Sequence, residues 1–167
     1  MTDSPATLLC KSCGLCCTGH LFIWTKLRSS ELDSIQSLGV EVLREPGQRG
    51  FSQPCPLWRE YCTIYETPHY PRFCRTYKCR LLKQVLEDIT PLPSALTTVR
   101  RTKSLIHTLN MVLPESSCPN FRERLTALLE REDVSSEIGQ KVKELLEVYE
   151  SQFGVSDLLD NPPQNSC

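Results

Sequence analysis

The cysteines between residues 10 and 79 are the residues whose type and spacing could do chemistry. Four of them fall within one octapeptide, Cys10-Lys11-Ser12-Cys13-Gly14-Leu15-Cys16-Cys17. Four more follow at Cys55, Cys62, Cys74 and Cys79. A C-x-x-C loop can turn both of its sulfurs toward one ion at about 2.3 Å, the usual zinc–thiolate distance. We therefore interpret the chain as a metal-thiolate protein whose metal ligands are these eight cysteines.

The spacing leaves the metal open, because zinc, mononuclear iron and iron–sulfur clusters all accept four thiolates. The C-x-x-C-x-x-C run of the octapeptide is also the run that holds three corners of an iron–sulfur cube in bacterial ferredoxins, where a remote Cys-Pro completes the site. This sequence has such dipeptides at Cys55-Pro56 and Cys118-Pro119. The expected cofactor is a zinc or iron ion, and a 4Fe-4S cluster is the alternative. Eight thiols suit two four-ligand sites or one polynuclear site.

Other donors are weaker candidates. His20 and His69 are close enough in sequence to replace a thiol, although an isolated histidine in a loop is more often a surface residue. His107 falls in a predicted helix far from the cysteines. Cys118 could be a ninth ligand, but a lone cysteine is usually a small buried apolar residue. Cys167, close to the C-terminus, is expected to be incidental.

The composition is that of an ordinary soluble domain of 167 residues. The first nine residues have neither the basic nor the apolar region of a signal peptide, and no apolar run approaches the roughly 20 residues that span a bilayer. We expect a cytoplasmic protein without a membrane partner, in which thiols stay reduced and metal binding is favoured over disulfides. The net charge of −1 gives no electrostatic field that would attract nucleic acid. The cysteines make metal ions the expected partners.

The sequence contains no motif that indicates a catalytic site. The phosphate-binding patterns G-x-x-x-x-G-K-[ST] and G-x-G-x-x-G are absent, and so is the zinc-protease pattern H-E-x-x-H. The C-x-x-x-C-x-x-C run of radical S-adenosylmethionine enzymes is also missing. A Cys–His nucleophile pair stays open, but ligation is the simpler role for so many neighbouring thiols. The basic residues 100–103 favour a solvated helix face over a phosphate site.

The pattern predicts an α+β fold that is mostly α: an irregular cysteine-rich lobe with short strands, packed on a layer of four or five helices. Strands are expected at 21–25 and 61–65, paired with each other, and turns at 44–54. A short helix should begin near Glu31, capped by Ser29 or Ser30, and end at Gly39. Apolar spacing then predicts four helices between residues 77 and 153, the last ending at Gly154.

One domain is expected, with the cysteine-cluster metal-binding lobe at 1–90 and the helical part at 91–155. Residues 156–167 should form a flexible tail. The first half has few periodic apolar residues, so we expect that it needs its metal in order to fold.

Four segments together resemble the YkgJ-type cysteine-cluster family, which carries a CxxCxxCC signature. They are the octapeptide, Cys55-Pro56-Leu57, Cys62-Thr63-Ile64-Tyr65-Glu66, and the segment from Pro71 through Cys79. The resemblance covers about residues 10–85 and implies a zinc- or iron-chelating domain. The loop at 67–72 departs from the family pattern, because it is longer and lacks the usual arginine-proline.

Three hypotheses follow from the residues and the resemblance. The first is an accessory protein that holds zinc or iron without catalysis. The second is an iron–sulfur enzyme with a redox or protein-methylation-linked role, since flagellin lysine methylases have a related cysteine signature. The third is a structural module whose metal folds a docking surface for a partner.

Overall fold

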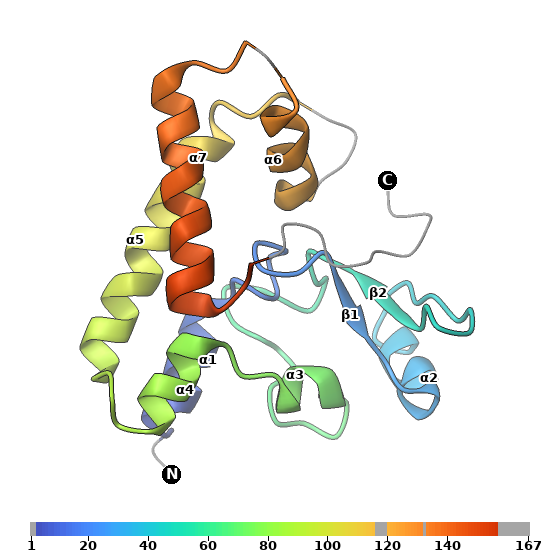
Figure 1. Cartoon of the computed structure of the whole chain (residues 1–167). Coiled ribbons are helices and arrows are strands. Elements are labelled where there is room, and N and C mark those ends of the chain that lie inside the picture. The colour runs from blue at the N-terminus through green and yellow to red at the C-terminus, as the bar shows by residue number, and fades with distance from the viewer. Residues whose placement is uncertain (1–2, 116–119, 132, 157–167) are drawn as a thin grey trace. The chain divides into compact units, whose positions relative to one another are not determined.

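The structure is a computed structural model that describes residues 3–115, 120–131 and 133–156. These residues form seven α-helices and one two-stranded sheet, so the expected mostly-α, α+β fold class is confirmed (Figure 1). They divide into two units, of which the first is discontinuous in sequence. The helical unit comprises residues 3–13 and the described residues from 78 to 156. The loop-rich unit comprises residues 14–77.

Amphipathic helices make up the helical unit. They are α1 (Pro5–Cys13), α4 (Arg80–Leu86), α5 (Leu92–Asn110), α6 (Phe121–Leu129) and α7 (Ser136–Val148), followed by the π-helical turn η2 (Tyr149–Phe153). The long helix α5 packs against α1 and α7, and α4 packs against α1 and η2 (Figure 1). Spacing of three and four places Val99, Thr102, Ile106 and Leu109 on the buried face of α5. The four helices predicted after residue 77 are therefore confirmed as α4 to α7.

The ends of these helices are stabilised by side chains. Asn120 Oδ1 accepts hydrogen bonds from the Arg122 and Glu123 N–H groups at the start of α6, which satisfies two donors that a helix N-terminus leaves open. After α7, the Arg80 guanidinium donates to the Glu150 and Ser151 carbonyl oxygens at 3.0 and 3.1 Å. Arg80 therefore ties the start of α4 to the C-terminal turn of the same unit.

Short elements make up the loop-rich unit. They are β1 (Trp24–Lys26), the 3-10 turn η1 (Ser29–Glu31), α2 (Leu32–Gln36), β2 (Gly50–Ser52) and α3 (Arg72–Thr76). The strands β1 and β2 pair antiparallel, with Trp24 opposite Ser52 and Lys26 opposite Gly50. The helix α3 packs against β1. Most of the unit is turn and loop.

Two predictions for this unit are wrong. The segment 61–65 forms turns, and its Cys62 makes an isolated bridge with Trp58; the strand that pairs with β1 lies instead in the segment expected to be turns. A strand of three residues is too short to show the alternation that identifies strands in a sequence. Ser29 and Ser30 lie inside η1 and do not cap it.

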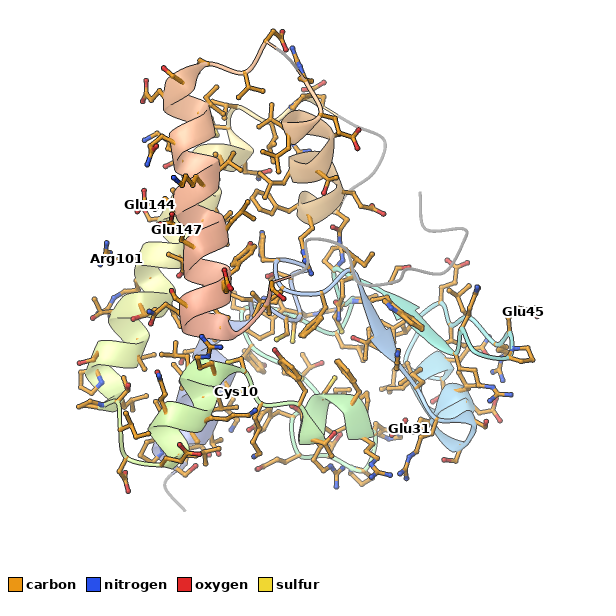
Figure 2. All side chains as sticks on the ribbon, in the orientation of Figure 1. Cys10, Glu31, Glu45, Arg101, Glu144 and Glu147 are labelled. Atoms are coloured by element: carbon orange, nitrogen blue, oxygen red, sulfur yellow. The ribbon has the colours of Figure 1, made fainter. Side chains whose placement is uncertain are left out.

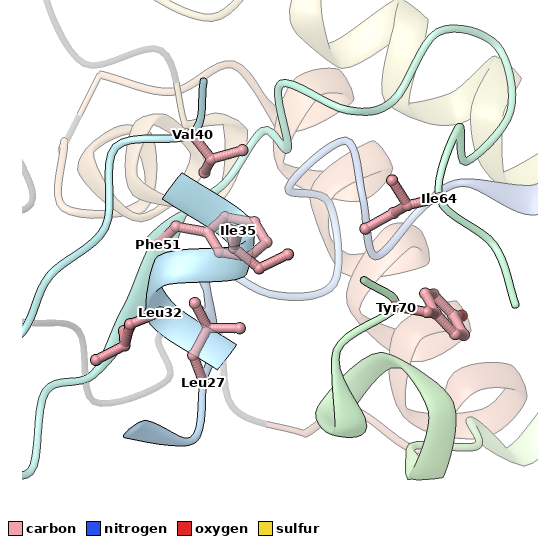
Figure 3. Close-up of a cluster of buried hydrophobic side chains, with 7 residues drawn as sticks. All are labelled: Leu27, Leu32, Ile35, Val40, Phe51, Ile64 and Tyr70. Atoms are coloured by element: carbon pink, nitrogen blue, oxygen red, sulfur yellow. The ribbon is translucent and has the colours of Figure 1, made fainter. Parts of the chain in front are cut away.

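One apolar cluster forms the core on which the loops of this unit rest (Figure 3). Its buried members are Leu27, Leu32, Ile35, Val40, Phe51, Ile64 and Tyr70. Three half-buried cysteines, Cys55, Cys62 and Cys74, pack against the same cluster. The core that stabilises the unit therefore also positions three of the eight thiols.

All of the expected tail at 156–167 except residue 156 lies outside the described residues, as do Cys118 and Cys167. Within the residues that are described, no helix combines the length and the apolar character needed to span a bilayer.

Substitution of Ile35 tests the apolar cluster. Ile35 is completely buried, so Ile35→Ala should lower the free energy of unfolding by about 2–5 kcal/mol, through lost burial and the cavity left behind. Leu38 follows the same helix but is 36% exposed, and Leu38→Ala should change stability by only about 0.5 kcal/mol. Denaturant unfolding followed by circular dichroism measures both. Equal losses from the two variants would contradict this core.

Candidate metal centre

Cys10 and Cys13 lie in the last turn of α1, which ends at Cys13. Cys10 is labelled in Figure 2. The sequence suggested a curled loop for this C-x-x-C pair, but the helix begins at Pro5, a favourable first helical residue, and continues through Cys13. Residues three apart lie on the same face of a helix. The two cysteines therefore share a face by helical geometry.

Gly14 ends this helix and turns the chain into the second half of the octapeptide. Its φ of +67° lies in the left-handed region that favours glycine. A Cβ at Gly14 would lie 2.1 Å from Cζ2 of Trp58, so the indole occupies the space of a side chain. The Gly14 carbonyl oxygen accepts hydrogen bonds from the Thr18 N–H at 2.8 Å and from the Thr18 hydroxyl at 2.9 Å. Cys16 and Cys17 lie inside this closed turn.

The loop from Cys55 to Cys62 lies against that turn in the loop-rich unit. The Cys55 N–H donates to the Cys17 carbonyl oxygen at 2.7 Å, and the Trp58 N–H donates to the Cys55 carbonyl oxygen at 3.1 Å. Trp58 also forms a backbone bridge with Cys62. The structure thus brings the segments of Cys17, Cys55 and Cys62 together.

Desolvation controls the protonation of these thiols. Burial raises the pKa of Cys55 above its ordinary value, and the nearby Cys62 adds to the increase, while N–H groups of Leu57 and Trp58 oppose it. Burial likewise raises the pKa of Cys62. Both groups are therefore neutral thiols at neutral pH in the absence of metal. A metal that binds them as thiolates must displace their protons.

Cys74 lies on α3, which side chains hold in place at both ends. The Tyr70 hydroxyl donates to the Cys74 carbonyl oxygen at 3.2 Å. The Glu31 carboxylate, labelled in Figure 2, accepts from the Arg72 N–H at 2.6 Å and from the Arg28 N–H at 2.7 Å. One carboxylate therefore joins η1 to the first turn of α3.

Three half-buried aromatic rings, one of them on α3, pack against one another. The rings of Phe73 and Tyr77 flank Cys74 in sequence and stack with centroids 5.8 Å apart. Phe22 meets Phe73 edge-on at 5.7 Å and Tyr77 edge-on at 4.8 Å. These contacts join α3 and the residue that follows it to Phe22, which precedes β1.

Cys79 caps the start of α4 in the helical unit. Its sulfur accepts a hydrogen bond from the Leu82 N–H at 3.4 Å. Burial raises the pKa of Cys79 despite this hydrogen bond. Because α4 packs against α1, Cys79 shares a helix pair with Cys10 and Cys13. Lys103 of α5 donates to the Ser12 carbonyl oxygen at 3.1 Å and so fixes the last turn of α1.

The histidines take different positions. The Nδ1 atom of His20 lies 2.6 Å from the Thr18 hydroxyl oxygen. The Nδ1 atom of His69 lies 2.6 Å from the Ser34 hydroxyl oxygen on α2. His107 is exposed on α5.

All eight predicted cysteines are half-buried, and their soft sulfur donors suit zinc or iron. Three lie in the helical unit, Cys10, Cys13 and Cys79; five lie in the loop-rich unit, Cys16, Cys17, Cys55, Cys62 and Cys74. Across residues 3–115, 120–131 and 133–156, no three cysteine, histidine, aspartate or glutamate side chains are already arranged to hold one ion. The thiols therefore fit a metal in kind, and the eight-cysteine ligand set stays a prediction.

Sequence reasoning missed the residues that position the thiols. Trp58 and Glu31 act through contacts between segments that are distant in sequence, so no local pattern marks them. The Tyr70 hydrogen bond to Cys74 spans only four residues, but no motif marks it either. Only Gly14 had a sequence signal, as the glycine between the two halves of the octapeptide.

Residues 9–94 match the model of one protein family, described as "CxxCxxCC: Putative zinc- or iron-chelating domain". The match covers just over half of the 167 residues and contains all eight cysteines. Neither the curated proteins nor the solved structures include a match to this chain.

Substitution of Gly14 tests the turn of the octapeptide. Gly14→Ala introduces both left-handed strain and a collision with the Trp58 ring. Gly39 has a φ of +84° with nothing within 4 Å of an added Cβ, so Gly39→Ala carries the strain alone, about 1–2 kcal/mol. Gly14→Ala should destabilise the protein clearly more, as measured by denaturant unfolding. A smaller loss at Gly14 than at Gly39 would refute the indole contact.

Substitution of Glu31 tests the attachment of α3. Glu31→Gln removes the charge and one of two acceptor oxygens, which should cost about 1–2 kcal/mol and speed hydrogen exchange of the amides in α3. Exchange measured by mass spectrometry on peptides covering residues 72–77 reports the change. Glu45, which is exposed and labelled in Figure 2, gives the control: Glu45→Gln should leave α3 exchange unaltered. Unaltered exchange in both variants would show that Glu31 does not hold α3.

Proposed function

Because this chain belongs to the CxxCxxCC family of zinc- or iron-chelating domains, we propose that it is an accessory metal-thiolate protein that binds zinc or iron through eight thiolates. The proposed ligands are Cys10, Cys13, Cys16, Cys17, Cys55, Cys62, Cys74 and Cys79. The observation that carries the proposal is the hydrogen bond from the Cys55 N–H to the Cys17 carbonyl oxygen. This bond joins the octapeptide to a loop with two further half-buried thiols.

The proposed role of the protein's own residues is to present sulfur in a partly dry environment. Burial keeps Cys55, Cys62 and Cys79 as neutral thiols without metal. Their protons leave as thiolates form, so metal uptake should weaken as the pH falls. When bound, zinc or iron supplies cross-links between loop segments that contain little regular structure. This proposal requires a reducing compartment such as the cytoplasm, where the ligands stay reduced.

The second candidate function is an iron–sulfur protein with a redox or protein-methylation-linked role. It is favoured by the C-x-x-C-x-x-C run followed by the remote dipeptide Cys55-Pro56. The same cysteines serve both candidates, so the bound metal decides between them.

Metal analysis of anaerobically purified protein, together with its visible spectrum, tests the two candidates. Since one zinc ion takes four thiolates, the zinc form should be colourless and contain about two ions per chain. Brown protein with acid-labile sulfide would support the cluster and exclude zinc. Protein that takes up neither zinc nor iron would contradict both candidates.

Serine substitution tests the ligand set. Cys16→Ser should reduce the metal content, because the hydroxyl is a poor replacement for a soft thiolate donor. Cys167→Ser serves as the control, since Cys167 is outside the proposed set, and it should retain the full metal content. Equal metal loss from both variants, or none from either, would contradict the ligand assignment.

A further inference from the structure

The side chain of Trp58 touches the octapeptide at its only glycine. Three indole atoms, Cζ2, Cη2 and Cε2, lie within 2.1–2.7 Å of the point where a Cβ on Gly14 would be. The edge of the ring therefore lies on the Gly14 backbone, between Cys13 and Cys16 in sequence.

The backbone of Trp58 belongs to the loop that carries two further thiols. Its N–H donates to the Cys55 carbonyl oxygen at 3.1 Å, and its backbone bridges to Cys62. The neighbouring Leu57 carbonyl oxygen accepts from the Thr63 N–H at 3.1 Å and from the Thr63 hydroxyl at 2.8 Å. These bonds close the loop on both sides of Trp58, so the backbone that carries the indole is fixed.

Trp58 therefore connects two thiol-bearing segments, one through its side chain and the other through its backbone. The Cys55 N–H bond to Cys17 connects the same two segments independently, at 2.7 Å. A ring held this way restricts how far the Gly14–Cys17 turn can move from the Cys55–Cys62 loop.

We propose that Trp58 is a positioning residue of the metal centre, where its indole holds the Gly14 turn against the Cys55–Cys62 loop and slows the loss of the bound metal. This inference rests on the proposed function, since it assigns Trp58 a role toward metal bound by those cysteines. Trp58 itself coordinates nothing; it acts through the segments on either side.

The chain offers a matched control in its other tryptophan. Trp24 lies in the same unit, is 6% exposed, and also packs on a glycine: its Cε3 and Cζ3 atoms lie 2.9 Å from the Cβ position of Gly50. Trp24 lies on β1, outside both the Gly14–Cys17 turn and the Cys55–Cys62 loop. Trp24→Phe therefore also replaces an indole that packs on a glycine, in this case Gly50 of β2.

The test compares Trp58→Phe with Trp24→Phe in the full-length protein loaded with Zn²⁺ or Co²⁺. Trp58→Phe should release Zn²⁺ to a competing chelator roughly tenfold faster than the wild type. It should also shift the visible bands of bound Co²⁺, which report the geometry of the thiolate ligands. Trp24→Phe should leave the release rate and the bands unchanged, even where it lowers the stability of the fold.

Fluorescence supplies a second measurement that does not require Trp58→Phe to fold. Trp24→Phe leaves Trp58 as the only tryptophan, and its emission should change when Zn²⁺ binds. Trp58 emission that is indifferent to Zn²⁺, or equal release rates and Co²⁺ bands for the two variants, would overturn the inference while metal binding stands. Wild-type protein that takes up neither Zn²⁺ nor Co²⁺ would instead overturn the proposed function, and the inference with it.

Discussion

The loop-rich unit depends on one constraint: loops with almost no regular structure must bury enough apolar surface and satisfy their backbone groups. Its two strands have three residues each. The sheet therefore buries little apolar surface and forms few backbone hydrogen bonds. The seven-residue cluster around Ile35 and Phe51 supplies the burial. Hydrogen bonds within turns, such as those to the Gly14 and Leu57 carbonyl oxygens, pair the backbone N–H and C=O groups. Cys55, Cys62 and Cys74 pack against this cluster, so their positions follow from it.

Polar and charged side chains connect the short elements where the apolar cluster does not reach. Glu31 joins η1 to α3, and Tyr70 combines a buried ring with a hydroxyl bonded to the Cys74 backbone. Similar hydrogen bonds occur in the helical unit. Lys103 of α5 donates to the last turn of α1, and Arg80 of α4 donates to the turn after α7. Segments distant in sequence are thus held by single donors and acceptors.

Burial of the thiols has two opposing consequences. It partly shields the sulfurs from water, which strengthens the interaction of a thiolate with a cation. It also disfavours the thiolate until a cation is present, as the raised pKa values of Cys55, Cys62 and Cys79 indicate. Hydrogen bonds from backbone N–H groups, such as that of Leu82 to Cys79, reduce this penalty only in part. Without a cation, the folded chain therefore holds these three cysteines as neutral thiols at neutral pH.

The sequence by itself determined the family, the fold class and the four helices from α4 to α7. Cysteine spacing and apolar periodicity are local patterns, so they can be seen without coordinates. The tertiary structure decided the rest: that β2 pairs with β1, that Cys10 and Cys13 end a helix, and that Trp58 covers Gly14. Each of these depends on which distant segments meet, or on where a helix stops, and a three-residue strand or a single ring contact leaves no periodic signal. The sequence identifies the thiols, and only packing between distant segments shows what holds them.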